Sequence, residues 1–559
     1  MPAVDLLYAV PAMRLDRAAL SQTLTFAFAA GGGSDAFARV LARPRLEPST
    51  FNADCFAADL FLDDFVKLCL GRARGASTRT FNPQALRLLL TQPPCDRGTI
   101  ELRHAVLSEL AESPRLYQAC EDAWLRIDQV RTLIESAELG KRTGAIHRRV
   151  DILRQIAQVF EFLELAFGGA TSALGRVTEF ARVVASSDGF HHLREFLDYE
   201  GHLATVDLRV RVGQDGEIRS FDIVKATENS DNEHYRNPLA RLWSRIMMLL
   251  RGYAIREREV IGRLVEAVFD GIEDALINLF QLQLELEFYL AAMRFRQYSE
   301  QRGLEVSLPA LVPLDSSDSA TRLVRLFNPF LLQEELPPVP CDLKIGERGF
   351  VMVTGPNSGG KTRLLQAIGL AQLLAQTGFY VPARQAHLAW RNGLFVALVH
   401  QVSADQREGH LGSELVRIRR LFERSGFGDL VLLDELCSGT NPSEGEEIAQ
   451  LVISLLYRLA PQAFITTHFL EFAARLAKHP PVAGLDFLQV ELDDRLRPLY
   501  QFVPGVASTS LAAQTAERLG VTREALEALI EEKARARSLQ SSLPAPAPSE
   551  PEERADPDA

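Results

Sequence analysis

The sequence has few cysteines, no long apolar run and no excess of positive charge, and each absence narrows the class of protein. Its six cysteines form no C-x-x-C pair and fit no zinc-ligand spacing, which predicts free thiols in a reducing cytoplasm. No apolar run reaches the length of about 18 residues that a membrane span needs, and no signal-peptide pattern opens the chain. We therefore expect a cytoplasmic protein that does not contact a membrane.

The charge balance removes one broad argument for a nucleic-acid partner. The chain carries 61 Lys and Arg against 73 Asp and Glu, a net charge of −12. Bulk basic character, which favours nucleic-acid binding, is missing. A local basic groove can still lie on an acidic protein, so DNA binding is not excluded.

The length and apolar content predict a soluble protein of several domains. With 559 residues, 47% of them hydrophobic, the chain is long enough for about three domains. Pattern changes along it predict an N-terminal segment (1–50), a helical core or lever (51–315), an α/β domain (316–512), a C-terminal helical segment (513–540) and a disordered, Pro-rich tail (541–559).

The region before residue 316 is mostly helical by its apolar spacing. One exception is 204–224, where Val206 and Leu208 alternate with polar residues before the turn residues 213–216, which predicts a β-hairpin. Apolar residues then follow one stripe over about 237–302. This long helix is either a lever or coiled-coil arm, or a core helix with a kink near Gly271.

Short apolar runs alternate with helical patterns between about 320 and 510. Four of these runs read as buried strands: 350–353, 394–399, 430–433 and 463–465. Near-continuous apolar strands separated by helices are typical of an α/β sheet covered by helices.

A glycine-rich loop follows the first of these runs. It has the pattern G-x-x-x-x-G-K-[ST] and consists of Gly355, Pro356, Asn357, Ser358, Gly359, Gly360, Lys361 and Thr362. Between a strand and a helix, this pattern is a P-loop, in which backbone N–H groups and the helix N-terminus bind phosphates. Lys361 is expected to reach the β- and γ-phosphates and Thr362 to ligate Mg²⁺, so the cofactors are ATP and Mg²⁺.

Two later strand ends carry the remaining chemistry of an ATPase. Asp434 and Glu435 follow the run 430–433, and we expect Asp434 to hold Mg²⁺ through water and Glu435 to polarise the attacking water. His468 ends the run that begins at 463. Alone it would be a capped surface histidine, but after the two preceding motifs a γ-phosphate sensor is favoured.

These segments resemble the ATPase domain of the MutS family, within the ABC class. Thr354–Thr362 is similar to its T-G-P-N-x-G-G-K-[ST], Val381–Ala383 to its V-P-A, Asp434–Gly445 to its D-E-[IL]-x-x-G-T-x-x-x-[DE]-G, and Thr467-His468 to its T-H. The resemblance implies a multidomain fold: a mostly α-helical core or lever with a small β-hairpin, followed by an α/β P-loop ATPase domain of ABC type.

The resemblance also implies a homodimer with composite sites, joined through the helical segment 513–540. Each P-loop would face the other subunit's signature segment, here the degenerate 409–415, which retains Ser413 and Glu414. Tyr500 lies where the family stacks a ring on adenine, and packing in the core is an equal alternative.

The N-terminal part departs from the mismatch-recognising members. Those carry a separate N-terminal domain with an F-x-E wedge, for which we find no room. The tripeptide occurs at Phe162–Glu164 and Phe469–Glu471, neither in a plausible N-terminal module. Mismatch recognition therefore has no support from the residues.

Two functions remain open. The first is a MutS-like ATPase that clamps DNA by shape, in mismatch repair or recombination, with basic candidates Arg148, Arg149, Arg154, Arg209 and Arg211. The second is a nucleotide-switched interaction protein that acts on a protein or ribonucleoprotein partner, which the acidic charge favours.

Overall fold

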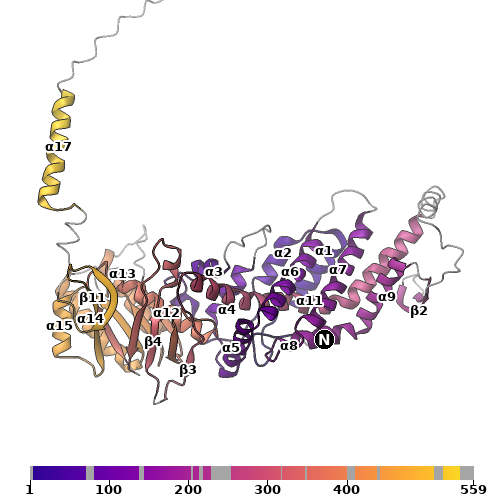
Figure 1. The fold of residues 1–559 in the computed structure, drawn as a ribbon, viewed down its shortest axis with the longest axis horizontal. Coiled ribbons are helices and arrows are strands. Elements are labelled where there is room, and N and C mark those ends of the chain that lie inside the picture. The colour runs from indigo at the N-terminus through magenta and orange to yellow at the C-terminus, as the bar shows by residue number, and fades with distance from the viewer. Residues whose placement is uncertain are drawn as a thin grey trace, which may run out of the picture.

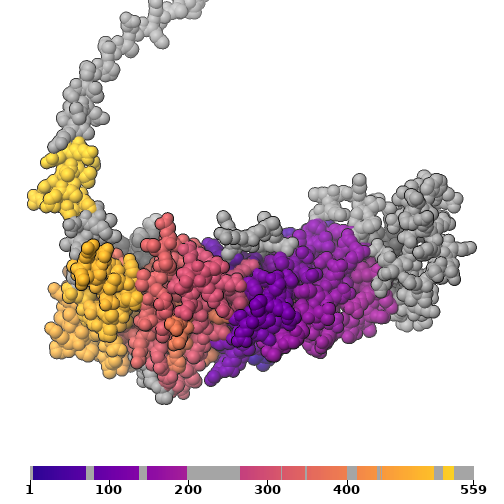
Figure 2. All heavy atoms as spheres, in the orientation of Figure 1, coloured from indigo at the N-terminus to yellow at the C-terminus, as the bar shows by residue number. Residues whose placement is uncertain are grey.

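The computed structural model describes residues 4–70, 81–136, 144–202, 205–212, 218–227, 254–316, 318–346, 349–398, 409–436, 441–508 and 520–541. They form an elongated body (Figure 2), with most of the helices toward one end and the two larger sheets toward the other (Figure 1). The fold is therefore a helical half followed by an α/β half.

The helical half consists of amphipathic helices whose starts are capped locally. Side chains of Asp16, Asn82, Asp96 and Ser113 accept hydrogen bonds from amides in the first turns of their helices, which satisfies donors that the helix itself cannot. The elements are α1 (Arg17–Ala30), α2 (Ser34–Leu41), η1 (Ala53–Cys55), α3 (Leu62–Leu70), α4 (Pro83–Thr91), α5 (Arg97–Glu112), α6 (Pro114–Glu135), α7 (Gly144–Ala166), α8 (Gly175–Ala185), α9 (Asp188–His202) and α11 (Ala254–Gln301).

The long helix α11 is a core helix over the stretch whose side chains are buried against the other helices. It has 48 residues, and its side chains from Val265 to Phe295 are largely buried. It runs unbroken through Gly271, where Gly189 of α9 comes so close that a β-carbon at position 189 would lie 2.1 Å from the Gly271 carbonyl oxygen. Gly271 thus marks a close helix crossing within an unbroken helix.

The predicted β-hairpin is present beside α9. Strands β1 (Thr205–Val212) and β2 (Ile218–Thr227) pair in antiparallel register, and β2 extends three residues beyond the predicted end at 224.

Residues of the predicted N-terminal segment (1–50) pack into the helical core within the described range 4–50. Leu6, Leu20 and Phe37 are fully buried in it. Glu285 of α11 accepts a hydrogen bond from the backbone N–H of Leu6 at 2.9 Å. Such contacts join residues nearly 300 positions apart, so local patterns could not reveal them.

The α/β half contains two sheets. The larger has the order β12-β11-β6-β10-β9-β8, with β12 antiparallel to β11 and all other neighbours parallel, and the smaller has the order β3-β7-β4-β5. The elements are β3 (Ala310–Val312), β4 (Thr321–Leu326), η2 (Pro329–Gln333), β5 (Cys341–Ile345), β6 (Phe350–Thr354), α12 (Lys361–Gln376), β7 (Gln385–Ala389), β8 (Leu394–Ala397), α13 (Gly409–Arg424), β9 (Leu430–Leu433), α14 (Pro442–Leu456), η3 (Tyr457–Leu459), β10 (Gln462–Thr467), α15 (Leu470–Lys478), β11 (Leu485–Leu492) and β12 (Pro498–Pro504).

All four predicted apolar strands are present, as β6, β8, β9 and β10, and every residue in them is buried.

The two halves are joined by Arg103 of α5, whose side chain is fully buried. Its Nε donates to the Leu7 carbonyl at 2.9 Å and its Nη1 to the Thr377 carbonyl at 2.7 Å. Since Thr377 is the C-cap of α12, this arginine ties the end of that helix to the helical half.

A further helix, α17 (Arg523–Ser541), stands apart from the body in Figure 1. The tail beyond residue 541 lies outside the described residues, so its predicted disorder remains a prediction.

Among the described cysteines, all thiols are free. In the same part of the chain, no helix combines the length and apolar character needed to cross a bilayer.

Candidate functional site

The glycine-rich loop joins the end of β6 to the start of α12, as its motif predicts. Two of its glycines are required by close contact with β11. A β-carbon at Gly355 would lie 2.7 Å from Val490 Cγ2, and one at Gly359 would lie 2.8 Å from the same atom. Gly355 and Gly360 also have positive φ angles, 139° and 84°, a region that L-residues rarely adopt. The loop conformation therefore depends on glycine.

Lys361 is a buried cation that faces neutral acceptors. Its side chain is 3% exposed, and its Nζ donates to the carbonyls of Gly355 at 2.9 Å and Pro356 at 3.1 Å. Burial lowers the pKa of Lys361, and the charges of Glu435 and Asp434 act in the opposite direction. A desolvated ammonium group surrounded by carbonyls is well suited to an anionic ligand, because an anion compensates it better than neutral dipoles do.

The first turn of α12 offers further donors at the same place. Its N-cap is Gly360, which provides no side-chain cap for the amides that follow. Uncapped amides at a helix N-terminus favour phosphate oxygens. The loop, Lys361 and the start of α12 thus fit a nucleotide phosphate chain.

Asp434 is held by two hydroxyl groups at the end of β9. Thr362 Oγ1 donates to Asp434 Oδ2 at 2.6 Å, and Thr466 Oγ1 donates to Asp434 Oδ1 at 2.5 Å. Thr466 comes from the adjacent parallel strand β10, and its Oγ1 also accepts from the Glu435 N–H at 2.9 Å. Hydroxyl and carboxylate oxygens are the ligands that Mg²⁺ prefers, so Thr362 and Asp434 fit this ion.

Thr466 is a site residue that sequence reasoning missed. We expect Thr466→Val, which keeps the shape of the side chain, to lower ATP turnover about tenfold or more, because Asp434 and the Glu435 N–H each lose a partner worth about 1–3 kcal/mol. The measurement is the steady-state rate at saturating ATP and Mg²⁺. Thr132→Val on α6, whose Oγ1 donates to the Asp128 carbonyl of the same helix, is the control, and equal rates for the two variants would contradict the assignment.

Glu435 and His468 lie together beyond the strand ends. Glu435 has a φ of 49°, a left-handed conformation that costs a non-glycine residue free energy and is common at functional sites. His468 Nδ1 lies 3.8 Å from Glu435 Oε2. Within the described residues, this nitrogen is buried and has no hydrogen-bond partner. The two side chains predicted from separate motifs are therefore neighbours.

Tyr500 of β12 lies against the loop. Its side chain is 44% exposed, and a β-carbon at Gly360 would lie 3.3 Å from its Cδ1. Of the two alternatives left open for this tyrosine, packing in the core is wrong, because the ring is too exposed. Its position beside the end of the P-loop is compatible with stacking on a base.

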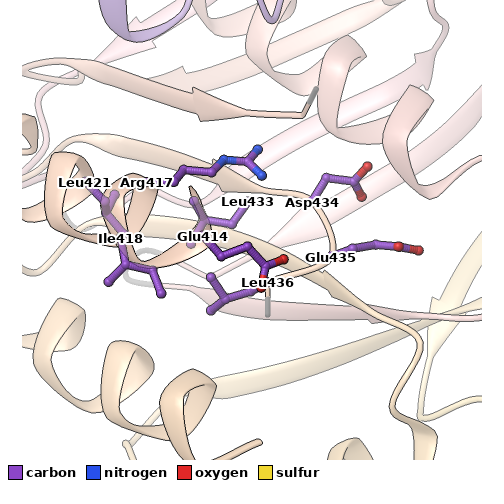
Figure 3. A pocket seen from close by; sticks show the side chains of 8 residues that line it. All are labelled: Glu414, Arg417, Ile418, Leu421, Leu433, Asp434, Glu435 and Leu436. Atoms are coloured by element: carbon purple, nitrogen blue, oxygen red, sulfur yellow. The ribbon is translucent and has the colours of Figure 1, made fainter. Parts of the chain in front are cut away.

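The signature residues lie on α13 of the same chain. Glu414 is buried and lines a pocket together with Asp434 and Glu435 (Figure 3). Ser413 is partly buried. The exposed side chains of this turn are Leu415 and Val416, at 45% and 56%. Glu414 is thus buried in the pocket, while the two residues that follow it expose apolar side chains.

Of the basic candidates for DNA contact, Arg148 is buried, Arg149 is mostly buried, and Arg154 is exposed. Arg148 is buried and donates to the carbonyls of Ala27 and Phe28 at the end of α1, so its assignment as a surface contact is wrong. Arg149 pairs with Glu266, and Arg154 with Asp151. The side chains of Arg209 and Arg211 lie outside the described residues.

The C-terminal part of the chain is similar to known proteins. Residues 351–536 match the family model of MutS domain V. A protein named Endonuclease MutS2 from Thermomicrobium roseum is 31% identical over 299 residues, which cover 52% of this chain and 36% of the relative. Endonuclease MutS2 from Thermus thermophilus is 33% identical over 227 residues, which cover 40% of this chain and 30% of the relative.

The matched region is about a third of the length of these relatives. It includes the P-loop, Asp434, Glu435 and His468, the residues that the structure brings to one edge of the larger sheet. Over residues 351–536, the chain is thus similar to the MutS family in its domain V.

Proposed function

We propose that this protein is an ATPase that binds Mg·ATP on residues 355–362 and hydrolyses it. The supporting observation is the convergence of Lys361, Thr362 and Asp434, from α12 and β9, with the 2.6 Å contact between Thr362 and Asp434. Three neighbouring parallel strands, β6, β10 and β9, end at this place. Ligands of open α/β sheets bind at the carboxyl ends of the strands.

Each residue of the site has a proposed role. Lys361 and the loop amides bind the phosphates, while Thr362 and Asp434 hold Mg²⁺, which when bound neutralises phosphate charge. Glu435 orients the attacking water, and His468 senses the γ-phosphate from its place beside Glu435. Tyr500 stacks on the adenine. Catalysis of this kind acts by positioning and by charge stabilisation.

The larger assembly is also part of the proposal. Two copies would form composite sites, with α17 in the dimer contact and Ser413 and Glu414 in the signature segment of the partner. Helix α17 exposes three apolar side chains, those of Leu526, Leu529 and Ile530. Such an exposed apolar face is typical of a surface that binds another protein chain. Because Glu414 is buried in its own subunit, the start of α13 would have to move for Glu414 to reach a second copy.

We propose that the dimer clamps DNA by shape, in mismatch repair or recombination. The support is kinship with the proteins named Endonuclease MutS2. The nuclease activity in that name belongs to those proteins, and we do not extend it to this chain. The alternative is a nucleotide-switched protein with a protein or ribonucleoprotein partner. The internal use of Arg148 and Arg149, together with the net charge of −12, favours it.

A single set of assays separates these functions. The ATPase rate is measured alone and with duplex, mismatched and branched DNA and with RNA, at two salt concentrations, alongside the mass with and without nucleotide. A DNA-clamping ATPase gives a rate that DNA changes, binding that weakens with salt, and a dimer mass. Hydrolysis that no nucleic acid alters, without binding at low salt, would favour the alternative. Absence of hydrolysis under every condition would contradict both.

A further inference from the structure

One charged residue beside the proposed metal site has no role in the functions above. Arg417 of α13 is partly buried and lines the same pocket as Asp434 and Glu435. Figure 3 shows its side chain extending toward Asp434. Its Nη2 is buried and, within the described part of the chain, has no hydrogen-bond partner. A guanidinium group with an unused donor is thus directed at the carboxylate that we assign to the metal.

The charges around Arg417 are three carboxylates. Burial lowers the pKa of Arg417, and Asp59, Asp434 and Glu414 act in the opposite direction, in that order. An arginine side chain stays protonated in proteins, so it is a fixed positive charge in this position. Arg417 is therefore influenced both by Asp434, which follows β9 of the sheet, and by Asp59, which comes from the helical half.

Asp59 belongs to a segment of the helical half, residues 53–60, that contacts the α/β half directly. Its Oδ1 accepts a hydrogen bond from the backbone N–H of Leu398 at 2.8 Å, at the end of β8. The adjacent Leu60 fills a notch on α12, because a β-carbon at Gly369 would lie 2.8 Å from Leu60 Cδ2. This segment thus touches the strand end next to β9 and the helix that follows the P-loop.

We infer that Arg417 is a positioning residue that weakens the hold of Asp434 on the metal, and that Asp59 controls this effect by drawing the guanidinium group away. The inference rests on the proposed binding of Mg·nucleotide. A guanidinium group and a metal ion compete for one carboxylate, because each is a cation. When Asp59 pairs with Arg417, the Asp434 carboxylate is available to bind the metal. Since Asp59 belongs to segment 53–60, the position of this segment sets the metal affinity.

The test measures metal binding to the full-length protein with ADP, without hydrolysis. Mn²⁺ replaces Mg²⁺ because the electron paramagnetic resonance signal of free Mn²⁺ reports the bound fraction, and protein is kept in excess over ADP. We expect Arg417→Met to bind Mn²⁺ about fivefold more tightly, as removal of a nearby cation requires. Arg417→Lys, which keeps a cationic group with a shorter reach, is expected to bind Mn²⁺ more weakly than Arg417→Met does. If Arg417→Met does not fold, Arg417→Gln makes the same charge change.

A second pair of variants tests the role of Asp59. Asp59→Asn keeps an acceptor for the Leu398 N–H but removes the charge, so Arg417 turns toward Asp434 and Mn²⁺ binding weakens about threefold. In the Arg417→Met background, the same substitution is expected to have no effect. Arg419→Met, on the exposed face of α13, is the control for loss of an arginine from this helix.

The outcomes separate this inference from the proposed function. A wild-type protein that binds ADP and Mn²⁺, with an Arg417→Met variant that binds Mn²⁺ equally or more weakly, overturns the inference alone. An Asp59→Asn effect of equal size in both backgrounds also overturns it. A wild-type protein that binds neither ADP nor ATP with any metal overturns the proposed function.

Discussion

Lys361→Ala is expected to abolish nucleotide binding, with affinity lower by about 100-fold or more. The residue is 3% exposed, and its Nζ is placed at the mouth of the P-loop by the carbonyls of Gly355 and Pro356. Each hydrogen bond from a charged donor is worth about 1.5–3 kcal/mol, and the ammonium group can donate more than one to the phosphates. The measurement is equilibrium titration with a fluorescent ATP analogue in the presence of Mg²⁺.

The control for this prediction is a lysine outside the site. Lys478→Ala, at the exposed end of α15, removes the same charge and should leave nucleotide affinity unchanged. The melting temperature of both variants is compared with that of the wild type, because the Gly355 and Pro356 carbonyls also lose a donor in Lys361→Ala. A folded Lys361→Ala protein with wild-type affinity would show that the loop does not bind phosphate.

Glu435→Gln is expected to retain nucleotide binding and to lose turnover by about 10²–10⁴-fold, the usual contribution of general acid–base catalysis. The amide keeps the size of the side chain but cannot take a proton from the attacking water. The backbone should be preserved, because the Glu435 N–H is held by Thr466 Oγ1 at 2.9 Å and glutamine makes the same bond. Single-turnover hydrolysis and analogue titration on one sample separate the two effects.

A second carboxylate provides the comparison. Glu491→Gln on β11 changes an exposed glutamate of the same sheet and should hydrolyse ATP at the wild-type rate. Glu435→Asp retains the base at a shorter reach and is expected to fall between the wild type and Glu435→Gln. Full hydrolysis by Glu435→Gln would remove Glu435 from the mechanism and leave His468 as the nearest candidate base.

The sequence was sufficient for features whose signal is local. The runs that became β6, β8, β9 and β10 are short and apolar, and a strand buried on both faces has this composition wherever it occurs. The glycine pattern of the loop predicts its conformation, because the close approach of Val490 leaves no space for a side chain at Gly355. The relation of Asp434 and His468 to this loop followed from their places at strand ends.

The predictions differed from the structure where a residue's contacts are far away in the sequence. Arginine side chains are usually exposed, but the Arg148 side chain is buried. It donates hydrogen bonds to the carbonyls of Ala27 and Phe28 at the end of α1. Residues 4–50 look irregular in isolation, yet they contact distant helices of the core, including α11 through the hydrogen bond from Leu6 to Glu285. Both features depend on residues more than 100 positions away, and hydrophobic periodicity contains no information on such pairs.

The amino-acid sequence alone thus determined the strands, the loop and the identity of the residues around the proposed nucleotide, since these depend on neighbours along the chain. Only the tertiary structure decided that Thr466 orients Asp434 and that Tyr500 lies on the loop. It also decided that Glu414 and Arg417 line one pocket with Asp434 and Glu435. The physical reason is that strand order in the sheet and the packing of α13 bring distant side chains within a few ångströms, and hydrogen bonds and charge interactions act only at that range.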